Sequence, residues 1–214
     1  KKIKKKFNST PFENIKEKLN FNLTKDQLNA INDINNDLSS DRKMFRLLQG
    51  DVGSGKTIVA LVCCLNVINS NFQASFMAPT EILAIQHYEL AKQLFGKNIT
   101  VKLLTSKTDY SERKQILNDL KNNKIDLLVG THSLFQEKII YRNLGLIVID
   151  EQHKFGVKQR KKLSDKGGKN CDVLVMSATP IPRTMIMTIF GDMDVTILKS
   201  KPKNRKDIKT YSKI

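Results

Sequence analysis

What this 214-residue sequence lacks excludes several classes of protein. It has no run of eighteen apolar residues, so no segment is long enough to cross a membrane as a helix. We also expect no secretory leader before the domain. Its three cysteines, Cys63, Cys64 and Cys171, are odd in number and without metal-ligand spacing, which argues against a disulfide framework and a zinc site. We therefore expect a reduced, cytoplasmic setting, with Cys63 and Cys64 as small core residues.

Acidic residues are scarce relative to basic ones. The 37 Lys and Arg stand against 21 Asp and Glu, which gives a formal net charge of +16. Such an excess suits a polyanionic partner, above all nucleic acid. Part of the excess lies at the ends, because five of the first six residues are Lys and another basic cluster runs from Lys199 to Lys213. A solvated basic surface is therefore the alternative interpretation.

A glycine-rich stretch follows a short apolar run and matches the pattern G-x-x-x-x-G-K-[ST]. Glycines let the backbone curl so that successive N–H groups face phosphate oxygens, and a helix beginning near Lys56 directs its positive end at the same anion. The Lys56 ammonium is expected to reach the β- and γ-phosphates and the Thr57 hydroxyl to ligate Mg²⁺. The nucleotide-binding residues predicted here are Gly50, Asp51, Val52, Gly53, Ser54, Gly55, Lys56 and Thr57. The alternative is a glycine-rich turn that binds nothing, and the apolar segments on both sides argue against it.

Short apolar runs alternate with longer helical patterns along the rest of the chain. The predicted strands are 46–49, 74–77, 100–104, 125–129, 144–150, 173–177 and 195–198. The predicted helices begin after residue 24 and at about Lys56, and two more run over 80–95 and 111–122. Strands that are apolar throughout and alternate with helices are typical of a parallel sheet covered on both faces. The predicted fold class is therefore α/β, a P-loop NTPase domain.

A second candidate site begins where the apolar run 144–149 ends. In an open parallel sheet, ligands lie at the carboxyl ends of the strands, so Asp150 is expected at the same edge as the glycine loop, holding Mg²⁺ through its water shell. Glu151 follows and is predicted to orient or deprotonate an attacking water. Gln152 and His153 are candidates for sensing the γ-phosphate. The alternative is a carboxylate pair that only opens the next helix.

Two other stretches allow both a structural and a functional interpretation. Thr24 and Gln27 have the T-x-x-Q spacing of a capping box at the start of a helix. Ser177 and Thr179 follow another buried strand, where turn chemistry alone explains them. The same sheet edge would nonetheless bring their hydroxyls towards the carboxylate site.

Five segments resemble the motifs of superfamily 2 helicases, in the order in which those enzymes carry them. They are residues 50–57 (motif I), 77–81 (Ia), 130–132 (Ic), 150–153 (II) and 177–179 (III). Longer matches, DEQHKFGVKQR at 150–160 and ATPIPRT at 178–184, are similar to the RecG family of ATP-dependent branched-DNA helicases. Mfd-type translocases share the glycine loop and TPIPRT but usually carry DEEH, so Gln152 favours the RecG family. Ile85 departs from the family pattern, which tends to have an acidic residue there.

The resemblance agrees with the roles predicted above, in which Lys56, Asp150, Glu151, Gln152 and His153 are catalytic and Thr57 and Asp150 lie at the metal. It also implies roles that spacing alone did not show. Phe21, Leu23, Thr24 and Gln27 would form an adenine pocket in which Gln27 reads the base edge. Pro79, Thr80, Gly130, Thr131 and His132 would line a track for DNA phosphates, which carries no sequence information. Ser177, Ala178 and Thr179 would couple the two sites. Helix N-capping is the alternative for Thr80 and Thr131. Arg183 would contact DNA or the second motor domain, with a solvated surface position as the alternative.

The resemblance also implies how the chain is divided. Residues 1–20 are interpreted as a linker or an upstream helix, 21–198 as a first RecA-like motor domain, and 199–214 as a linker to a second motor domain. That second domain would supply an arginine finger for phosphoryl transfer. A wedge domain would lie upstream, and a first residue other than Met suggests a piece of a longer polypeptide.

The implied activity is that of an ATP-dependent helicase or translocase. It would use ATP and Mg²⁺ to act on branched double-stranded DNA, such as replication forks and Holliday junctions, in recombination and repair. We expect a monomer in the bacterial cytoplasm, and negligible hydrolysis by this segment alone. The alternatives are an Mfd-like transcription-repair translocase module, or a P-loop kinase or nucleotide-binding module that does not act on DNA.

Overall fold

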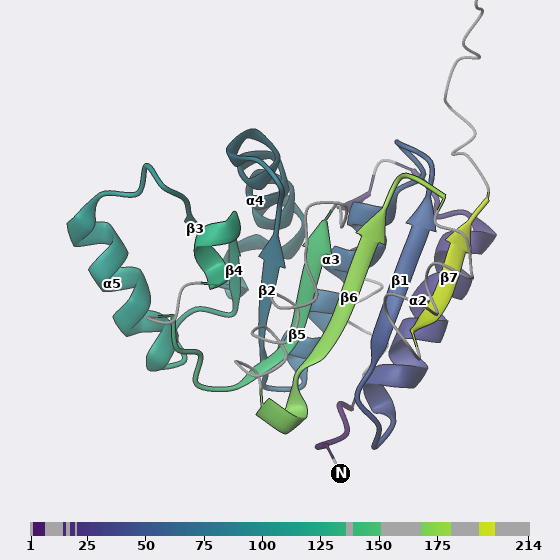
Figure 1. Ribbon diagram of the computed structural model, residues 1–214, viewed down its shortest axis with the longest axis horizontal. Coiled ribbons are helices and arrows are strands. Elements are labelled where there is room, and N and C mark those ends of the chain that lie inside the picture. The colour runs from purple at the N-terminus through teal and green to yellow at the C-terminus, as the bar shows by residue number, and fades with distance from the viewer. Residues whose placement is uncertain are drawn as a thin grey trace, which may run out of the picture.

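The computed structural model describes residues 2–6, 15, 18–19, 21–135, 139–150, 168–180 and 193–199. Its centre is a seven-stranded sheet in which every paired strand is parallel to its neighbour (Figure 1). The strands are β1 (Phe45–Gly50), β2 (Gln73–Met77), β3 (Val101–Leu104), β4 (Leu127–Gly130), β5 (Leu144–Asp150), β6 (Asp172–Ser177) and β7 (Asp194–Leu198). Their order across the sheet is β3-β4-β2-β5-β6-β1-β7. The predicted α/β class with a parallel central sheet is confirmed.

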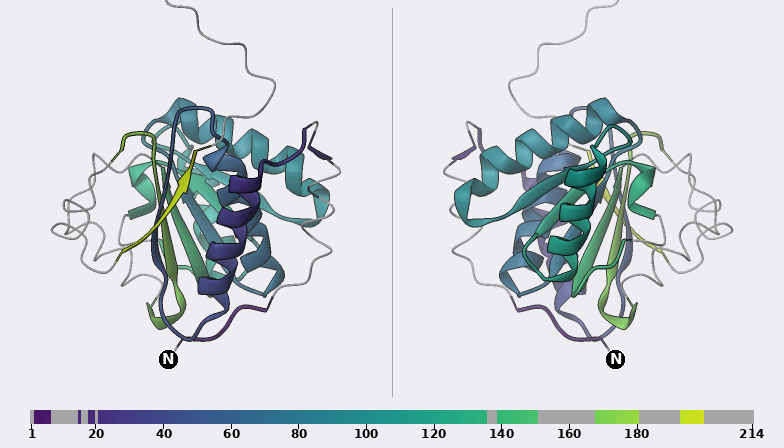
Figure 2. Two further views of the ribbon diagram at one scale, coloured as in Figure 1. Left: turned by 90° about the vertical axis from the view of Figure 1, so that its right-hand side faces the viewer. Right: turned by 90° about the vertical axis from the view of Figure 1, so that its left-hand side faces the viewer.

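Helices cover both faces of this sheet. The helices are α2 (Lys25–Ser39), α3 (Lys56–Asn69), α4 (Glu81–Phe95) and α5 (Tyr110–Lys121), with short 3-10 turns η1 (Gly96–Asn98), η2 (His132–Phe135) and η4 (Gly168–Asn170). Helices α2, α3 and α4 pack on one face (Figure 2). Helix α5 contributes Ile116 and Leu120 to the cluster on the other face. Within the described ranges, no helix combines the length and the apolar character that crossing a membrane requires.

Among the described helices α3 is the most deeply buried, because it packs on the middle of the sheet and is flanked by α2 and α4. Its residues from Ile58 to Ile68 are all buried. Cys63 and Cys64 are fully buried, which confirms their prediction as core residues. Burial raises the pKa of both thiols, so they stay protonated and unreactive. Cys171 lies in the opposite core cluster, and burial raises its pKa to about 12.

Local capping signals explain where two of the helices begin. Thr24 accepts a hydrogen bond from the Gln27 backbone, and the Gln27 side chain accepts one from the Thr24 backbone, so the predicted capping box is present at α2. Thr80 caps α4 by accepting from the Leu83 backbone N–H. Helix capping therefore explains Thr24 and Thr80, and their contacts with adenine and DNA stay predictions.

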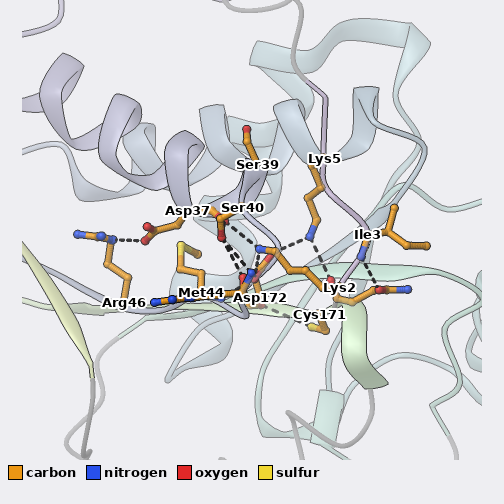
Figure 3. Close-up of polar contacts among 12 residues, drawn as sticks. Lys2, Ile3, Lys5, Asp37, Ser39, Ser40, Met44, Arg46, Cys171 and Asp172 are labelled. Carbon is orange, nitrogen blue, oxygen red and sulfur yellow. Dashed lines mark hydrogen bonds and ion pairs between the residues drawn. The ribbon is translucent and has the colours of Figure 1, made fainter.

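Lys2, Lys5 and Ile15, which precede α2, pack against the domain, and the sequence did not indicate these contacts. Lys2 and Lys5 were counted in a lysine-rich tail, but both ammonium groups contact the buried carboxylate of Asp172, at 2.7 and 2.5 Å (Figure 3). The Met44 backbone N–H donates to the same carboxylate at 2.7 Å. Ile15 also lies in the core, at 1% exposure. Part of the basic excess is therefore buried, and this correction reduces the charge available at the surface.

Candidate active site

The predicted site residues that the structure describes, apart from those before α2, lie at one edge of the sheet. Because all strands are parallel, their carboxyl ends share this edge. The phosphate loop follows β1, Asp150 ends β5, and Ser177 ends β6. Along the edge, the ends of β4 and β2 come first, then β5 and β6, then β1. Strand β6 alone separates β5 from β1, which puts Asp150 roughly 10 Å from the phosphate-loop strand.

The phosphate loop, residues 50–57, has the backbone that its glycines predict. Gly53 and Gly55 take φ values of +79° and +86°, which other residues rarely adopt. The Lys56 ammonium donates to the Gly50 carbonyl at 2.5 Å and to the Asp51 carbonyl at 3.0 Å, so the side chain folds over the loop. The Ser54 hydroxyl is buried and has no hydrogen-bond partner among the described residues.

These features fit a bound triphosphate. Helix α3 begins at Lys56, at the end of the loop, so its first-turn N–H groups and positive end face the loop. A buried hydroxyl without a partner, such as that of Ser54, costs free energy unless a ligand accepts from it. Thr57 lies in the first turn of α3, half-buried, where its hydroxyl fits a metal ligand. When bound, Mg²⁺ would neutralise phosphate charge at this place.

Gln27 makes one contact that sequence reasoning did not predict. Its Nε2 donates to the Ser54 carbonyl at 2.8 Å, while its Oε1 accepts from the Thr24 backbone in the predicted capping box. The side chain is 1% exposed, so it packs between α2 and the phosphate loop. Of the other predicted adenine-pocket residues, Phe21 is 42% exposed and Leu23 packs partly against the core. Their role towards adenine stays a prediction.

Asp150 is bound by a residue that the sequence analysis missed. The Nε2 of His87, on α4, lies 2.8 Å from Oδ2 of Asp150, and both residues are buried. No role was predicted for His87 from the sequence. A polar residue on the buried face of the helix predicted at 80–95 was the available signal, and its partner was not predictable from spacing. Glu151, Gln152, His153 and Arg183 lie outside the described residues.

Ser177 closes a turn at the end of β6. Its hydroxyl bonds the Thr179 carbonyl at 3.1 Å and the Thr179 hydroxyl at 3.2 Å, and the Thr179 backbone N–H donates to it at 3.3 Å. Ala178 lies between them, half-buried. Turn chemistry therefore accounts for this motif, and coupling stays a prediction.

The predicted DNA track lies at the ends of β2 and β4. Pro79 is half-buried, and Thr80 and His132 are exposed. Thr131 is half-buried, and its carbonyl accepts from the Leu134 backbone N–H in the turn η2. Steric crowding alone explains a glycine at position 130, because a Cβ on Gly130 would lie 2.3 Å from the Leu104 carbonyl oxygen.

The end of β3 brings two more polar residues to this side of the edge. The Thr105 hydroxyl donates to the Glu81 carboxylate at 3.1 Å, and Lys107 forms an ion pair with Glu81 at 3.3 Å. Lys107 is largely exposed. The sequence analysis did not single out Thr105 or Lys107, because neither belongs to the motifs quoted above.

Comparison with known proteins places this site in a family. A family model for DEAD/DEAH box helicases matches residues 24–188, which include the phosphate loop, Asp150 and Ser177. The chain belongs to the DEAD/DEAH box helicase family. Membership of this ATP-dependent family implies ATP as the nucleotide and argues against the kinase alternative.

Individual relatives show which DEAD/DEAH box helicases this chain is similar to. The ATP-dependent DNA helicase RecG of Thermotoga maritima is 50% identical over 209 residues, which cover 97% of this chain and 27% of that protein. RecG of Staphylococcus epidermidis is 47% identical, covering 98% of this chain and 29% of that protein. A solved structure of RecG bound to a three-way DNA junction superimposes with a TM-score of 0.83 at 44% identity, covering 97% of this chain and 28% of that one. The chain thus spans less than a third of the length of these relatives.

Proposed function

We propose that this chain is the first RecA-like motor domain of a RecG-type helicase, and that it binds Mg-ATP at the phosphate loop and DNA at the ends of β2 and β4. The proposal is carried by the similarity of the sequence to RecG together with the position of the motifs in the fold. The chain is 50% identical to a RecG over nearly its whole length, and its motifs lie along one sheet edge. The similarity to RecG agrees with Gln152 of the DEQH box, the residue that favours the RecG family over Mfd-type modules.

The nucleotide half of the edge runs from Asp150 at the end of β5 to the phosphate loop after β1, and each of its groups has a separate role. The Lys56 ammonium exchanges its loop carbonyls for the β- and γ-phosphates, and Ser54 and the loop N–H groups donate to phosphate oxygens. Thr57 and Asp150 hold the metal. Glu151 positions the attacking water, and Gln152 and His153 respond to the γ-phosphate. Phe21, Leu23, Thr24 and Gln27 receive the adenine.

The DNA half of the edge supplies phosphate contacts. Thr80 and His132 are exposed there, and Lys107 adds a cation beside Glu81. Hydroxyl, backbone and ammonium donors of this kind bind the strand without reading bases. Ser177 ends β6, the strand next to that of Asp150, and with Ala178 and Thr179 of the following turn it couples the two halves.

The greater length of the RecG relatives supports the proposal that other domains of the whole protein contribute to its activity. RecG relatives are more than three times as long as this chain, since it covers 27% to 29% of them. We propose a second motor domain that supplies an arginine finger and an upstream wedge domain that engages the fork, in a monomer that works in the bacterial cytoplasm. Hydrolysis by this chain alone is therefore expected to be negligible.

Binding of this chain to a labelled DNA fork, measured by fluorescence anisotropy at several salt concentrations, tests the DNA half of the proposal. A chain that contacts about three phosphates should lose affinity with a log–log salt slope of about −3. Lys107→Ala should reduce the slope by about one, and Lys97→Ala, an exposed lysine in η1, is the matched control.

Two results would contradict the proposal. One is the absence of measurable fork binding even at low salt. The other is robust DNA-stimulated ATP turnover by this chain alone, which would show that no second domain is needed.

A further inference from the structure

A buried hydrogen bond joins helix α4 to the carboxylate at the end of β5. His87 Nε2 and Asp150 Oδ2 are 2.8 Å apart. Because an ionised carboxylate only accepts, His87 Nε2 carries the hydrogen and donates. A carboxylate has two oxygens, so a bond at Oδ2 is compatible with a metal-bound water at Oδ1.

The His87 ring is itself held in place. It packs on the Phe76 ring of β2, with centroids 4.8 Å apart and planes tilted by 49°. His87 is 6% exposed and Phe76 is fully buried, so the imidazole has little room to rotate. Its bond to Asp150 therefore fixes the carboxylate relative to both α4 and β2.

We propose that His87 is a positioning residue that orients Asp150 for the metal and links it to the DNA track. This inference rests on the proposed function. The link runs along α4, because the helix that carries His87 is capped by Thr80, a predicted phosphate contact. A displacement of the start of α4 by DNA is thereby transmitted through one rigid helix to the metal-binding carboxylate.

The position of α4 makes this link specific. Strand β2 lies between β4 and β5, so α4, which follows β2, starts from the DNA half of the edge. Asp150 stands at the border with the nucleotide half. Among the side-chain hydrogen bonds described at this edge, the His87–Asp150 bond is the one that crosses from a DNA-track helix to the proposed metal ligand.

The test measures metal binding rather than turnover. Mn²⁺ is titrated into this chain with a non-hydrolysable ATP analogue and followed by electron paramagnetic resonance, for the wild type, His87→Leu and His87→Gln. Removing an outer partner of a metal ligand typically costs 10–100-fold in metal affinity, so His87→Leu should weaken Mn²⁺ binding by at least about tenfold. His87→Gln, which keeps a donor near the position of Nε2, should restore most of it.

Controls separate positioning from general damage. Gln86→Leu changes an exposed neighbour on the same helix and should bind Mn²⁺ as the wild type does. Analogue affinity in EDTA should be unchanged in all variants. Unchanged Mn²⁺ affinity in His87→Leu, failure of Gln to rescue, or an equal loss in EDTA would each overturn the inference. A wild-type chain that binds no analogue at all would instead contradict the proposed function.

Discussion

The side-chain amide of Gln27 donates a 2.8 Å hydrogen bond to the backbone carbonyl of Ser54. Helix α2 is thereby tied to the phosphate loop at the residue before Gly55. Space is tight there, since a Cβ on Gly55 would lie 2.2 Å from Gln27 Nε2. Gln27 therefore supports the loop in addition to any contact it makes with the base.

Replacing Gln27 should separate these two roles. We expect Gln27→Ala to weaken binding of both ATP and GTP, because the Ser54 contact supports the loop for any nucleotide. The loss should be larger for ATP, by about tenfold, because a base-edge hydrogen bond of about 1.4 kcal/mol is also removed. Calorimetric titration of the two nucleotides measures the difference. Equal weakening would assign Gln27 to loop support alone.

The buried cluster of Lys2, Lys5 and Asp172 predicts an asymmetric response to substitution. Asp172→Asn removes the carboxylate that pairs with both buried ammonium groups and should cost about 3–5 kcal/mol of unfolding free energy. Lys2→Met removes the surplus cation and should stay within about 1 kcal/mol of the wild type. Lys4→Met, at an exposed position of the same segment, is the control. Denaturant unfolding measures all three, and a large loss in Lys2→Met would contradict this account.

The same cluster predicts how stability depends on pH. Burial lowers the pKa of Lys2 below its ordinary 10.5, although the hydrogen bond to Asp172 opposes this shift. The unfolded chain therefore binds more protons than the folded chain between the lowered pKa and 10.5, so the contribution of Lys2 to stability rises with pH through that window. Lys2→Met should lack this rise when the difference in unfolding free energy is followed to pH 10.5. A wild-type minus Lys2→Met difference that falls with pH would show the opposite sign.

Gly130 offers a test of structural against functional need. A Cβ there would meet the Leu104 carbonyl at 2.3 Å, so Gly130→Ala should destabilise the domain by about 1–3 kcal/mol. Gly168 has a φ of +58° and open space around it, so Gly168→Asn is a matched control that should change little. Thermal and denaturant melts measure both. Wild-type stability with lost fork binding would instead assign Gly130 to the DNA track.

The sequence was informative wherever a signal is local. Apolar runs located each strand to within two residues, and the Thr24–Gln27 spacing marked the start of α2. The edge that gathers the site followed from the strand pattern, because parallel strands must end together. These features depend on neighbours within one element or on a general rule of topology.

Contacts between distant residues escaped prediction. Lys2 and Asp172 are 170 residues apart, and His87 and Asp150 are 63 apart. Lysines at a chain end look solvated until a buried carboxylate is placed beneath them, and a histidine on a helix has no visible partner until the sheet order is known. Such pairs are set by tertiary packing, which charge counting and periodicity do not encode.

The central claim is that the phosphate loop and Asp150 bind one Mg-nucleotide together. Its most direct test is calorimetric titration of a non-hydrolysable ATP analogue into this chain, in Mg²⁺ and in EDTA, for the wild type, Lys56→Ala and Asp150→Asn. We predict that Mg²⁺ tightens binding to the wild type, that Lys56→Ala weakens binding in both conditions, and that Asp150→Asn loses the Mg²⁺ gain while keeping its affinity in EDTA. An undiminished Mg²⁺ gain in Asp150→Asn would contradict the account.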